Sequence, residues 1–343
     1  MTEIPGLDLV RLRTYLDTNA SQLSGDLTAT LIPGGRSNLT YFVQAGECEY
    51  VLRRPPLGHV LKTAHDMARE YRVISALSEN AIPVPKSLHL CQDESVIGAP
   101  FYLMSKVEGT VYRSKQDTSL LTESQAKKMS SNLIETLAQL HQVDPAAVGL
   151  GDFGRVDGFL ERQVERWQKQ FASSKSREII GFDELATKLS KIIPTSTQTG
   201  VIHGDYRLDN CIMNSNLEVA AIVDWEMSTL GDCLSDLGLF AVYWDGILGL
   251  PDDPISGGIN SKQGFPSAAS LFNQYSLITG ARLGRINWYI AFGFFKLAVI
   301  LEGIHFRYSN GQTVGSGFND LGTLVAPLVG AGIEALSSDG MGK

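Results

Sequence analysis

Three polar residues in the middle of the chain have the types and spacing that phosphoryl transfer needs. Asp205 and Asn210 lie five residues apart after the apolar pair Val201-Ile202, and Asp224 follows fourteen residues later, after another apolar run. In this reaction one carboxylate accepts a hydroxyl proton, and an amide and a second carboxylate hold Mg²⁺ on the phosphates. The pattern therefore indicates a phosphoryl-transfer site.

A short hairpin is expected to position these residues. Residues 211–213 and 217–223 form two apolar arms around a turn at 214–216. Asp205 and Asn210 would lie on the loop before the first arm, and Asp224 would follow the second. The alternative is that Asp205 and Asn210 are turn formers and that Asp224 is a helix cap. The coincidence of three such groups favours the site.

Composition restricts the class of protein. The 343 residues are 43% hydrophobic and 19% charged, typical of a folded globular chain, and the net charge of -8 argues against binding to nucleic acid or to an anionic membrane surface. The four cysteines are far apart and lack metal-site spacing. The N-terminus shows no secretory signal, and Lys296 and Glu302 interrupt the most apolar segment, 288–304. We therefore expect a cytoplasmic protein without a membrane or nucleic-acid partner.

The first hundred residues have the pattern of a small sheet. A helix over 7–24 precedes strands near 27–31, 39–43 and 49–53, with Pro55-Pro56 ending the third strand. A helix over 63–80 and strands near 86–91 and 101–105 follow. These elements predict an antiparallel sheet with one main helix.

The rest of the chain has helical periodicity. Thr122 and Gln125 form a capping-box pattern at the start of a helix that runs to His141. Further helices are predicted near 157–172, 183–193, 234–248, 267–279, 285–308 and 319–336. The segment 249–267 is rich in glycine and proline, and the sequence does not decide whether it acts as a lid.

The motif His203-Gly204-Asp205-x4-Asn210, followed by 224–226 and Gly231-Asp232, resembles the signature of the aminoglycoside phosphotransferase and choline kinase-like superfamily. Segments 34–41, 51–56 and 140–141 are most similar to the phosphotransferase-like domains associated with acyl-CoA dehydrogenases. The resemblance implies an α+β, bilobal protein-kinase-like fold. It predicts a nucleotide-binding lobe at 1–104, a hinge at 105–109 and a mostly helical lobe with the catalytic loop and substrate site at 110–343.

The resemblance also implies roles for individual residues. Asp205 corresponds to the catalytic base, and Asn210 and Asp224 correspond to the Mg²⁺ ligands. His203 corresponds to a histidine that braces the catalytic loop through backbone hydrogen bonds. Asp232 and Asp236 correspond to acidic residues that tie down the loop after the metal-binding aspartate.

A glycine-containing turn is the candidate for phosphate binding. Gly34, Gly35, Arg36 and Ser37 lie between two predicted strands, where backbone N–H groups can face phosphate oxygens. This segment is neither a Walker A motif nor a protein-kinase GxGxxG loop, and an ordinary hairpin turn is the alternative.

The third strand carries arginine where a kinase carries lysine. Strand alternation places Arg53 and Arg54 on opposite faces, so only one can face ATP, and we favour Arg53. Glu70 on the predicted small-lobe helix is its expected ion-pair partner, with an exposed helix charge as the alternative. At the hinge, Met104, Ser105 and Val107 are the candidates for adenine recognition.

The predicted activity is ATP- and Mg²⁺-dependent transfer to a hydroxyl group of a small molecule. Nine acidic residues and no lysine or arginine between 208 and 261 fit a cationic acceptor such as an amino alcohol or aminoglycoside, or else a metal site with solvated acids. The resemblance suggests a hydroxyacyl-CoA instead, with Arg155, Arg162, Arg166 and Lys169 available for an anionic group.

A catalytically inactive nucleotide-binding module is the alternative. A protein kinase is disfavoured because Gly231 follows Asp224 by only seven positions, which leaves no room for an activation loop. The sequence leaves the oligomeric state open.

Overall fold

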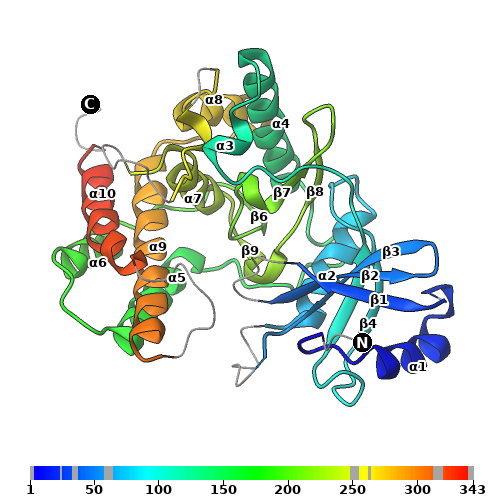
Figure 1. The fold of residues 1–343 in the computed structure, drawn as a ribbon. Helices are drawn as coiled ribbons and strands as arrows, with labels where there is room; N and C mark the ends of the chain where they lie inside the picture. The colour runs from blue at the N-terminus through cyan, green and yellow to red at the C-terminus, as the bar shows by residue number, and fades with distance from the viewer. Residues whose placement is uncertain are drawn as a thin grey trace. The chain divides into compact units, whose positions relative to one another are not determined.

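The computed structural model describes residues 4–23, 25–32, 38–57, 65–247, 255–261, 264–311 and 320–338. The chain forms two compact units, and each is discontinuous in sequence (Figure 1). Unit 1 comprises Met1–Thr110 and Cys211–Ser228, and unit 2 comprises Val111–Asn210 and Thr229–Lys343. The first boundary lies next to the predicted hinge. The assignment of Cys211–Ser228 to unit 1 differs from the prediction of one uninterrupted lobe over 110–343.

Backbone hydrogen bonds explain why this hairpin joins unit 1. Thr110 and Met213 form an isolated antiparallel bridge with N···O distances of 2.8 and 2.9 Å. The Ile222 N–H donates to the Pro83 carbonyl at 2.7 Å. The predicted hairpin is present as β7 (Cys211–Met213) and β8 (Val219–Ile222), followed by the short helix η3 (Trp225–Met227).

The main sheet of unit 1 has five antiparallel strands, as the sequence predicted, and their order is β1-β2-β3-β5-β4. The strands are β1 (Leu27–Leu31), β2 (Leu39–Ala45), β3 (Cys48–Arg54), β4 (Ser87–Cys91) and β5 (Phe101–Ser105).

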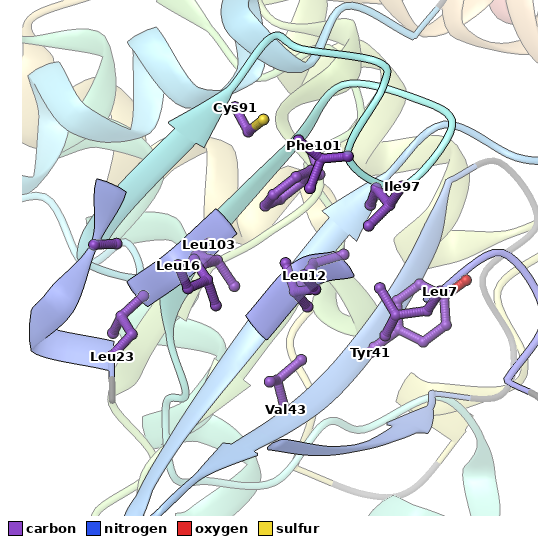
Figure 2. Packing of buried hydrophobic residues seen from close by; sticks show 13 residues of the cluster. Leu7, Leu12, Leu16, Leu23, Tyr41, Val43, Cys91, Ile97, Phe101 and Leu103 are labelled. Atoms are coloured by element: carbon purple, nitrogen blue, oxygen red, sulfur yellow. The ribbon is translucent and has the colours of Figure 1, made fainter. Parts of the chain in front are cut away.

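Helix α1 (Leu9–Asn19) covers one face of this sheet and is followed by the turn η1 (Ser21–Leu23). Asp8 caps its N-terminus by accepting the N–H groups of Val10 and Arg11. Leu12 and Leu16, which are one turn apart, pack with Tyr41, Val43, Phe101 and Leu103 of the sheet (Figure 2).

Helix α2 (Met67–Ser78) packs beside β4 and β5 on the opposite face. Asp66 caps it by accepting the Arg69 N–H at 3.0 Å, so the helix begins at Met67 and not near 63 as predicted. Residues 63 and 64 lie outside the described residues. Capping places Glu70 in the first helical turn, where its side chain is buried.

Unit 2 is mostly helical. Its helices are α3 (Lys115–Thr118), α4 (Glu123–His141), α5 (Phe159–Ser174), α6 (Phe182–Lys191), α7 (Leu234–Asp245), α8 (Ala268–Thr279), α9 (Ile286–Ser309) and α10 (Val325–Ser338), with short helices η2 (Leu208–Asn210), η4 (Ile259–Ser261) and η5 (Leu321–Leu324). The predicted capping box of Thr122 and Gln125 is present at α4. Strands β6 (Thr199–Ile202) and β9 (Thr229–Asp232) pair antiparallel.

Helix α9 forms the centre of unit 2 and contacts α5, α6, α7 and α10 (Figure 1). Glycines allow α7 and α9 to approach closely. A Cβ atom at Gly238 would overlap the Tyr289 carbonyl, and one at Gly293 would lie 3.0 Å from the Gly238 carbonyl. This close crossing lets side chains of both helices reach the loop after β6.

Two described segments, Ile286–Ser309 and Leu321–Ser338, are long and apolar enough to cross a membrane by length and composition alone. Buried core helices of globular proteins pass the same test. In α9, 67% of the most apolar window is buried within the protein, whereas the second segment is 33% buried. The prediction that 288–304 is a buried core helix is thus confirmed.

Candidate functional site

The loop that carries Asp205 starts where β6 ends. Val201 and Ile202 are buried, and Gly204 then adopts a left-handed conformation with φ of +82°, which turns the chain. The buried His203 ring accepts the Asp205 N–H at Nδ1, with a distance of 3.2 Å. His203 therefore holds the backbone on which Asp205 sits, in agreement with its expected bracing function.

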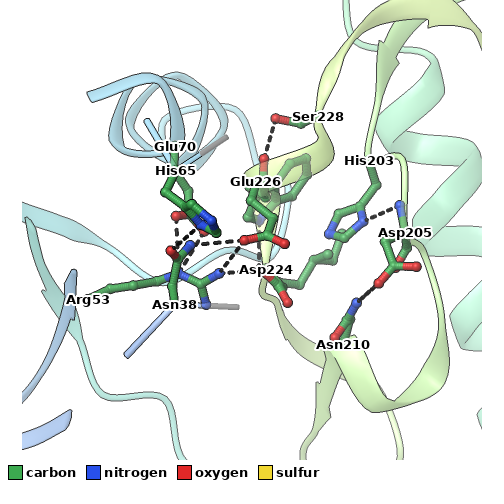
Figure 3. Close-up of polar contacts among 12 residues, drawn as sticks. Asn38, Arg53, His65, Glu70, His203, Asp205, Asn210, Asp224, Glu226 and Ser228 are labelled. Atoms are coloured by element: carbon green, nitrogen blue, oxygen red, sulfur yellow. Dashed lines mark hydrogen bonds and ion pairs between the residues drawn. The ribbon is translucent and has the colours of Figure 1, made fainter. Parts of the chain in front are cut away.

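Asp205 and Asn210 are paired. The Asn210 Nδ2 donates to the Asp205 carbonyl at 2.9 Å and to the Asp205 carboxylate at 3.0 Å (Figure 3). Since both bonds use the amide nitrogen, the Asn210 Oδ1 is left as the available ligand atom. An amide oxygen is a ligand that Mg²⁺ prefers.

Asp236 on α7 fixes the backbone immediately before Asp205. Its carboxylate accepts the His203 N–H at 2.7 Å and the Gly204 N–H at 2.8 Å, and contacts His141 Nε2 at 3.2 Å. Burial would raise the pKa of Asp236, but the hydrogen bonds and charges of His141 and His203 bring this pKa below its ordinary value. Asp236 thus ties down the loop before Asp205, not the loop after Asp224 as predicted.

Asp232 has a structural position near the start of α7. Its carboxylate accepts the Leu234 N–H at 2.9 Å and the Tyr289 hydroxyl at 2.7 Å. These contacts join β9, α7 and α9.

Sequence reasoning missed a second set of groups around Asp205. The Arg207 guanidinium forms an ion pair with Asp209 and lies 4.1 Å from the centre of the Tyr243 ring. The Tyr243 side chain is hydrogen-bonded to Asp205 and Arg207, and burial followed by the Asp205 charge raises the pKa of Tyr243. Arg207, Tyr243 and Trp244 line a small pocket with Ile255 and Ile259 of the Gly/Pro-rich segment.

In unit 1, Arg53 is the centre of a buried charge cluster (Figure 3). Its Nε lies 3.1 Å from the Glu70 carboxylate, which confirms the predicted ion pair. The guanidinium also donates to Asp224 and lies 3.7 Å from Glu226. Three carboxylates therefore surround one cation, and the surplus negative charge suits a region that also attracts a metal ion.

Arg54 points to the opposite face of β3, as strand alternation predicted. It donates to the backbone carbonyls of Gly6 and Ile97. Between the two arginines, Arg53 alone contacts Glu70 and Asp224.

Asp224 has an unusual backbone conformation. It follows β8 and adopts a φ of +68°, in the left-handed region that few side chains other than Asn and Asp tolerate. Its side chain is 33% exposed, whereas that of Glu70 is 1% exposed. Asp224 is therefore the most exposed of the three carboxylates in this cluster.

Glu226 belongs to a hydrogen-bonded chain that sequence reasoning did not assign. The Asn38 Nδ2 donates to Glu226 at 3.0 Å, and the His65 Nδ1 contacts the Asn38 Oδ1 at 2.8 Å. Burial and then the Arg53 charge lower the pKa of His65. The signal for Glu226 was its place in Asp224-Trp225-Glu226. The predicted phosphate loop of Gly34, Gly35, Arg36 and Ser37 lies outside the described residues.

The three hinge candidates differ in their available groups. The Met104 side chain is buried in the sheet, and the Ser105 N–H donates to the Lys86 carbonyl at 2.8 Å. Among the described residues, nothing pairs with the backbone N–H or carbonyl of Val107. Val107 is therefore the candidate with backbone groups free to recognise an adenine edge.

The described carboxylates between 208 and 261 all have polar partners. Asp209 pairs with Arg207, Glu218 with Asn214, Asp224 and Glu226 with Arg53, Asp232 with Tyr289, Asp236 with His141, and Asp245 with the Ala268 N–H. Asp252 and Asp253 lie outside the described residues. The described part of this stretch thus does not form an unengaged acidic wall.

The residues fit Mg²⁺ only in combination with phosphate ligands. Among the residues that the structure describes, no group of three or more His, Cys, Asp and Glu side chains could hold a metal ion. Mg²⁺ usually takes one or two protein ligands together with substrate phosphates and water. An Asn210 amide oxygen and an Asp224 carboxylate match that requirement in type and number.

Comparison with known proteins identifies the family. Residues 28–256 match the sequence profile of the phosphotransferase enzyme family. The chain belongs to this family. It is accordingly a phosphotransferase of the small-molecule kinase class, and the expected resemblance is confirmed.

Curated relatives are longer proteins. The chain is 35% identical to acyl-CoA dehydrogenase family member 11 of Rattus norvegicus over 337 residues, which cover 95% of this chain and 43% of that protein. The chain thus spans less than half the length of this relative.

Solved structures share the fold. A Ralstonia eutropha protein that carries the provisional name aminoglycoside phosphotransferase is 33% identical, with a TM-score of 0.81 over 96% of this chain and 98% of that one. A thermostable variant of aminoglycoside phosphotransferase APH(4)-Ia, crystallised with ADP and hygromycin B, is 13% identical, with a TM-score of 0.61 over 96% and 98% of the two chains. These neighbours confirm the α+β kinase-like fold.

Proposed function

We propose that this phosphotransferase moves the γ-phosphoryl group of ATP to a hydroxyl group of a small molecule in an Mg²⁺-dependent reaction. The Asp205–Asn210 pair carries the proposal, because it combines a partly exposed carboxylate with an amide whose oxygen remains available. The ADP complex of APH(4)-Ia, which has the same fold, supports a nucleotide donor.

In the proposed reaction Asp205 accepts the hydroxyl proton while the hydroxyl oxygen bonds to the γ-phosphorus and the bond to ADP breaks. His203 and Asp236 keep the Asp205 backbone in place through the hydrogen bonds described above. Arg53 binds phosphate oxygens and is held in position by Glu70. Mg²⁺ held by Asn210 and Asp224 would neutralise phosphate charge.

Replacing Asp205 with alanine tests this assignment. We expect Asp205→Ala to lower ATP-dependent transfer by about 10²- to 10⁴-fold, as for loss of a general base, while ATP affinity changes little. The measurement is ATP consumption with aminoglycosides, choline-like amines, sugars and hydroxyacyl-CoA thioesters. Glu218→Ala is the control, because Glu218 lies in the β7–β8 turn and, among the described residues, its side chain pairs with Asn214. Full turnover by the Asp205 variant contradicts the assignment.

For the acceptor we propose a hydroxyacyl-CoA, with an amino alcohol or aminoglycoside-like compound as the alternative. The name of the Rattus norvegicus relative supports the thioester. The engaged carboxylates between 208 and 261 weaken the case for a cationic acceptor. An open groove of about 650 Å³ along α5 is lined by Arg162, Arg166 and Lys169 together with Glu165, which pairs with Lys169, so the lining has a net positive charge for an anionic group. Turnover of amines without turnover of thioesters in the same panel would reverse this choice.

A further inference from the structure

A buried lysine in the central helix of unit 2 contacts the loop that carries Asp205. Lys296 lies in α9 between Phe295 and Leu297, both buried, and is itself 9% exposed. Its Nζ donates to the Gly204 carbonyl at 2.5 Å and lies 5.6 Å from the centre of the Trp167 ring. The Gly204 carbonyl precedes the Asp205 nitrogen in the chain.

Packing does not account for this lysine. Burial lowers the pKa of Lys296, while the charges of Asp205 and Asp236 act in the opposite direction. A methionine would fill a similar volume in this apolar helix without the cost of removing an ammonium group from water. The ammonium therefore reduces stability relative to an apolar side chain, which points to a use in the site.

The contact acts on the glycine of the loop backbone that precedes Asp205. Gly204 has a φ of +82°, and glycine has little intrinsic preference that would hold this conformation. The Asp236 carboxylate on α7 accepts the Gly204 N–H at 2.8 Å, and the Lys296 Nζ on α9 donates to the Gly204 carbonyl. The following N–H, that of Asp205, is bound by His203. Lys296 thus fixes the peptide plane that leads into Asp205.

We propose that Lys296 is a positioning residue for phosphoryl transfer. It holds the Gly204–Asp205 peptide in the orientation that directs the Asp205 carboxylate, at a cost in stability. This inference rests on the proposed role of Asp205 as catalytic base.

The first experiment compares stability with turnover. We expect Lys296→Met to unfold at the same or a higher temperature than wild type. Its kcat should fall about 100-fold, the size of effect that a 1 Å misplacement produces, while the KM for ATP changes less than twofold. Lys296→Arg should recover part of kcat, because a guanidinium can donate to the same carbonyl. A merely structural role would not give higher stability together with lower kcat.

The second experiment reports on the loop without requiring activity. Hydrogen–deuterium exchange in peptides covering 201–210 should be faster in Lys296→Met than in wild type. Glu302→Gln is the matched control, because Glu302 is also a buried charge on α9 but pairs with Ser176 and Arg177. This control should lower the melting temperature and leave both kcat and exchange of 201–210 unchanged. If Lys296→Met does not fold, Lys296→Leu takes its place with the same expectations, because leucine is also apolar and has no donor for the Gly204 carbonyl.

The outcomes separate this inference from the proposed function. Unchanged kcat and unchanged loop exchange in the Lys296 variant overturn the positioning role. A kcat that falls only in proportion to lost folded protein also overturns it. Faster loop exchange in the variant, combined with no transfer by wild type to any acceptor, contradicts the proposed function and with it the role in phosphoryl transfer, and leaves only the structural statement that Lys296 fixes the Gly204–Asp205 peptide.

Discussion

At the scale of single residues, Arg53 explains why this chain can use arginine where kinases use lysine. The guanidinium has five N–H donors in a planar fork, and here it serves Glu70, Asp224 and Glu226 together. Glu70 is fully buried, and burial raises its pKa while Arg53 opposes that shift. A lysine has one charged centre and could not satisfy these three groups in the same geometry.

Exchange of the two neighbouring arginines for lysine should therefore have different effects. We expect Arg53→Lys to raise the KM for ATP about tenfold, equivalent to about 1.4 kcal/mol, because the lysine cannot keep the Glu70 contact and also meet phosphate. Arg54→Lys is the control, since Arg54 donates to the Gly6 and Ile97 carbonyls on the other face. It should affect thermal stability but leave the KM unchanged. Equal KM values for both variants would argue against a nucleotide role for Arg53.

Asp236 gives a prediction about pH. Its folded-state pKa is lowered, so its carboxylate stabilises the fold above the ordinary pKa of about 3.9, and this stabilisation is lost as pH falls through the lower folded-state pKa. We expect Asp236→Asn to lower the free energy of unfolding by about 3–5 kcal/mol at pH 7, the cost of breaking a buried charge network. Urea unfolding should show this difference shrinking below about pH 4. A difference that grows toward acid would exclude the assigned sign.

At the scale of secondary-structure elements, the crossing of α7 and α9 is the feature that supports the catalytic loop. Asp236 and Lys296 reach Gly204 from these two helices, and the glycines Gly238 and Gly293 allow the helices to approach. The positions of the Asp236 and Lys296 side chains at the loop thus depend on glycine, which has no Cβ atom, at 238 and 293.

Enlarging the residue at this crossing should disturb both stability and catalysis. We expect Gly238→Ala to lower the free energy of unfolding by about 1–3 kcal/mol, because its Cβ would overlap the Tyr289 backbone. Turnover should fall as well, because Asp236 shifts with α7. Gly330→Ala on α10 is the control: no atom lies within 4 Å of its added Cβ, and alanine favours helix. Thermal unfolding and ATP-dependent transfer should be measured on both variants. Equal stability and equal turnover of Gly238→Ala and Gly330→Ala would contradict the importance of this helix crossing.

The elements were largely predictable from sequence because each has a local signal. Alternation predicted the strands, capping residues set the start of α4, and the Asp205–Asn210–Asp224 spacing marked the loop and hairpin. The contacts of Lys296 and Tyr243 were not predictable. Lys296 contacts Gly204, which lies 92 residues earlier in the chain. Tyr243 lies on α7 and contacts Asp205 and Arg207 of a different element. The pairing of residues 211–228 with unit 1 was also missed, because backbone bonds to Thr110 and Pro83 leave no sequence pattern.

At the scale of the whole molecule, neither unit is a continuous stretch of chain. The chain passes from one unit to the other after Thr110, Asn210 and Ser228. Removing the first 110 residues would therefore also remove the binding partners of β7 and β8, whose Met213 and Ile222 are buried.

A fragment of residues 111–343 tests this arrangement. We expect the fragment to bind a hydrophobic dye such as ANS more strongly than the full chain, because the hairpin residues lose their cover. Replacing 211–228 in the fragment by a Gly/Ser linker of equal length should reduce dye fluorescence. Equal fluorescence with hairpin and linker would show that 211–228 does not need the rest of unit 1.

The discontinuity also has a consequence for synthesis on the ribosome. The five-stranded sheet with its Arg53–Glu70 pair emerges first, but the hairpin and Asp224 follow only after the unit 2 segment Val111–Asn210. At translation rates of about 5–20 residues per second, synthesis of the rest of unit 1, which includes β7 and β8, is complete roughly 6–24 s later. During that interval Arg53 can neutralise Glu70 but has no Asp224 to bind. The buried ion pair between β3 and α2 therefore compensates the Glu70 charge before the hairpin has been synthesised.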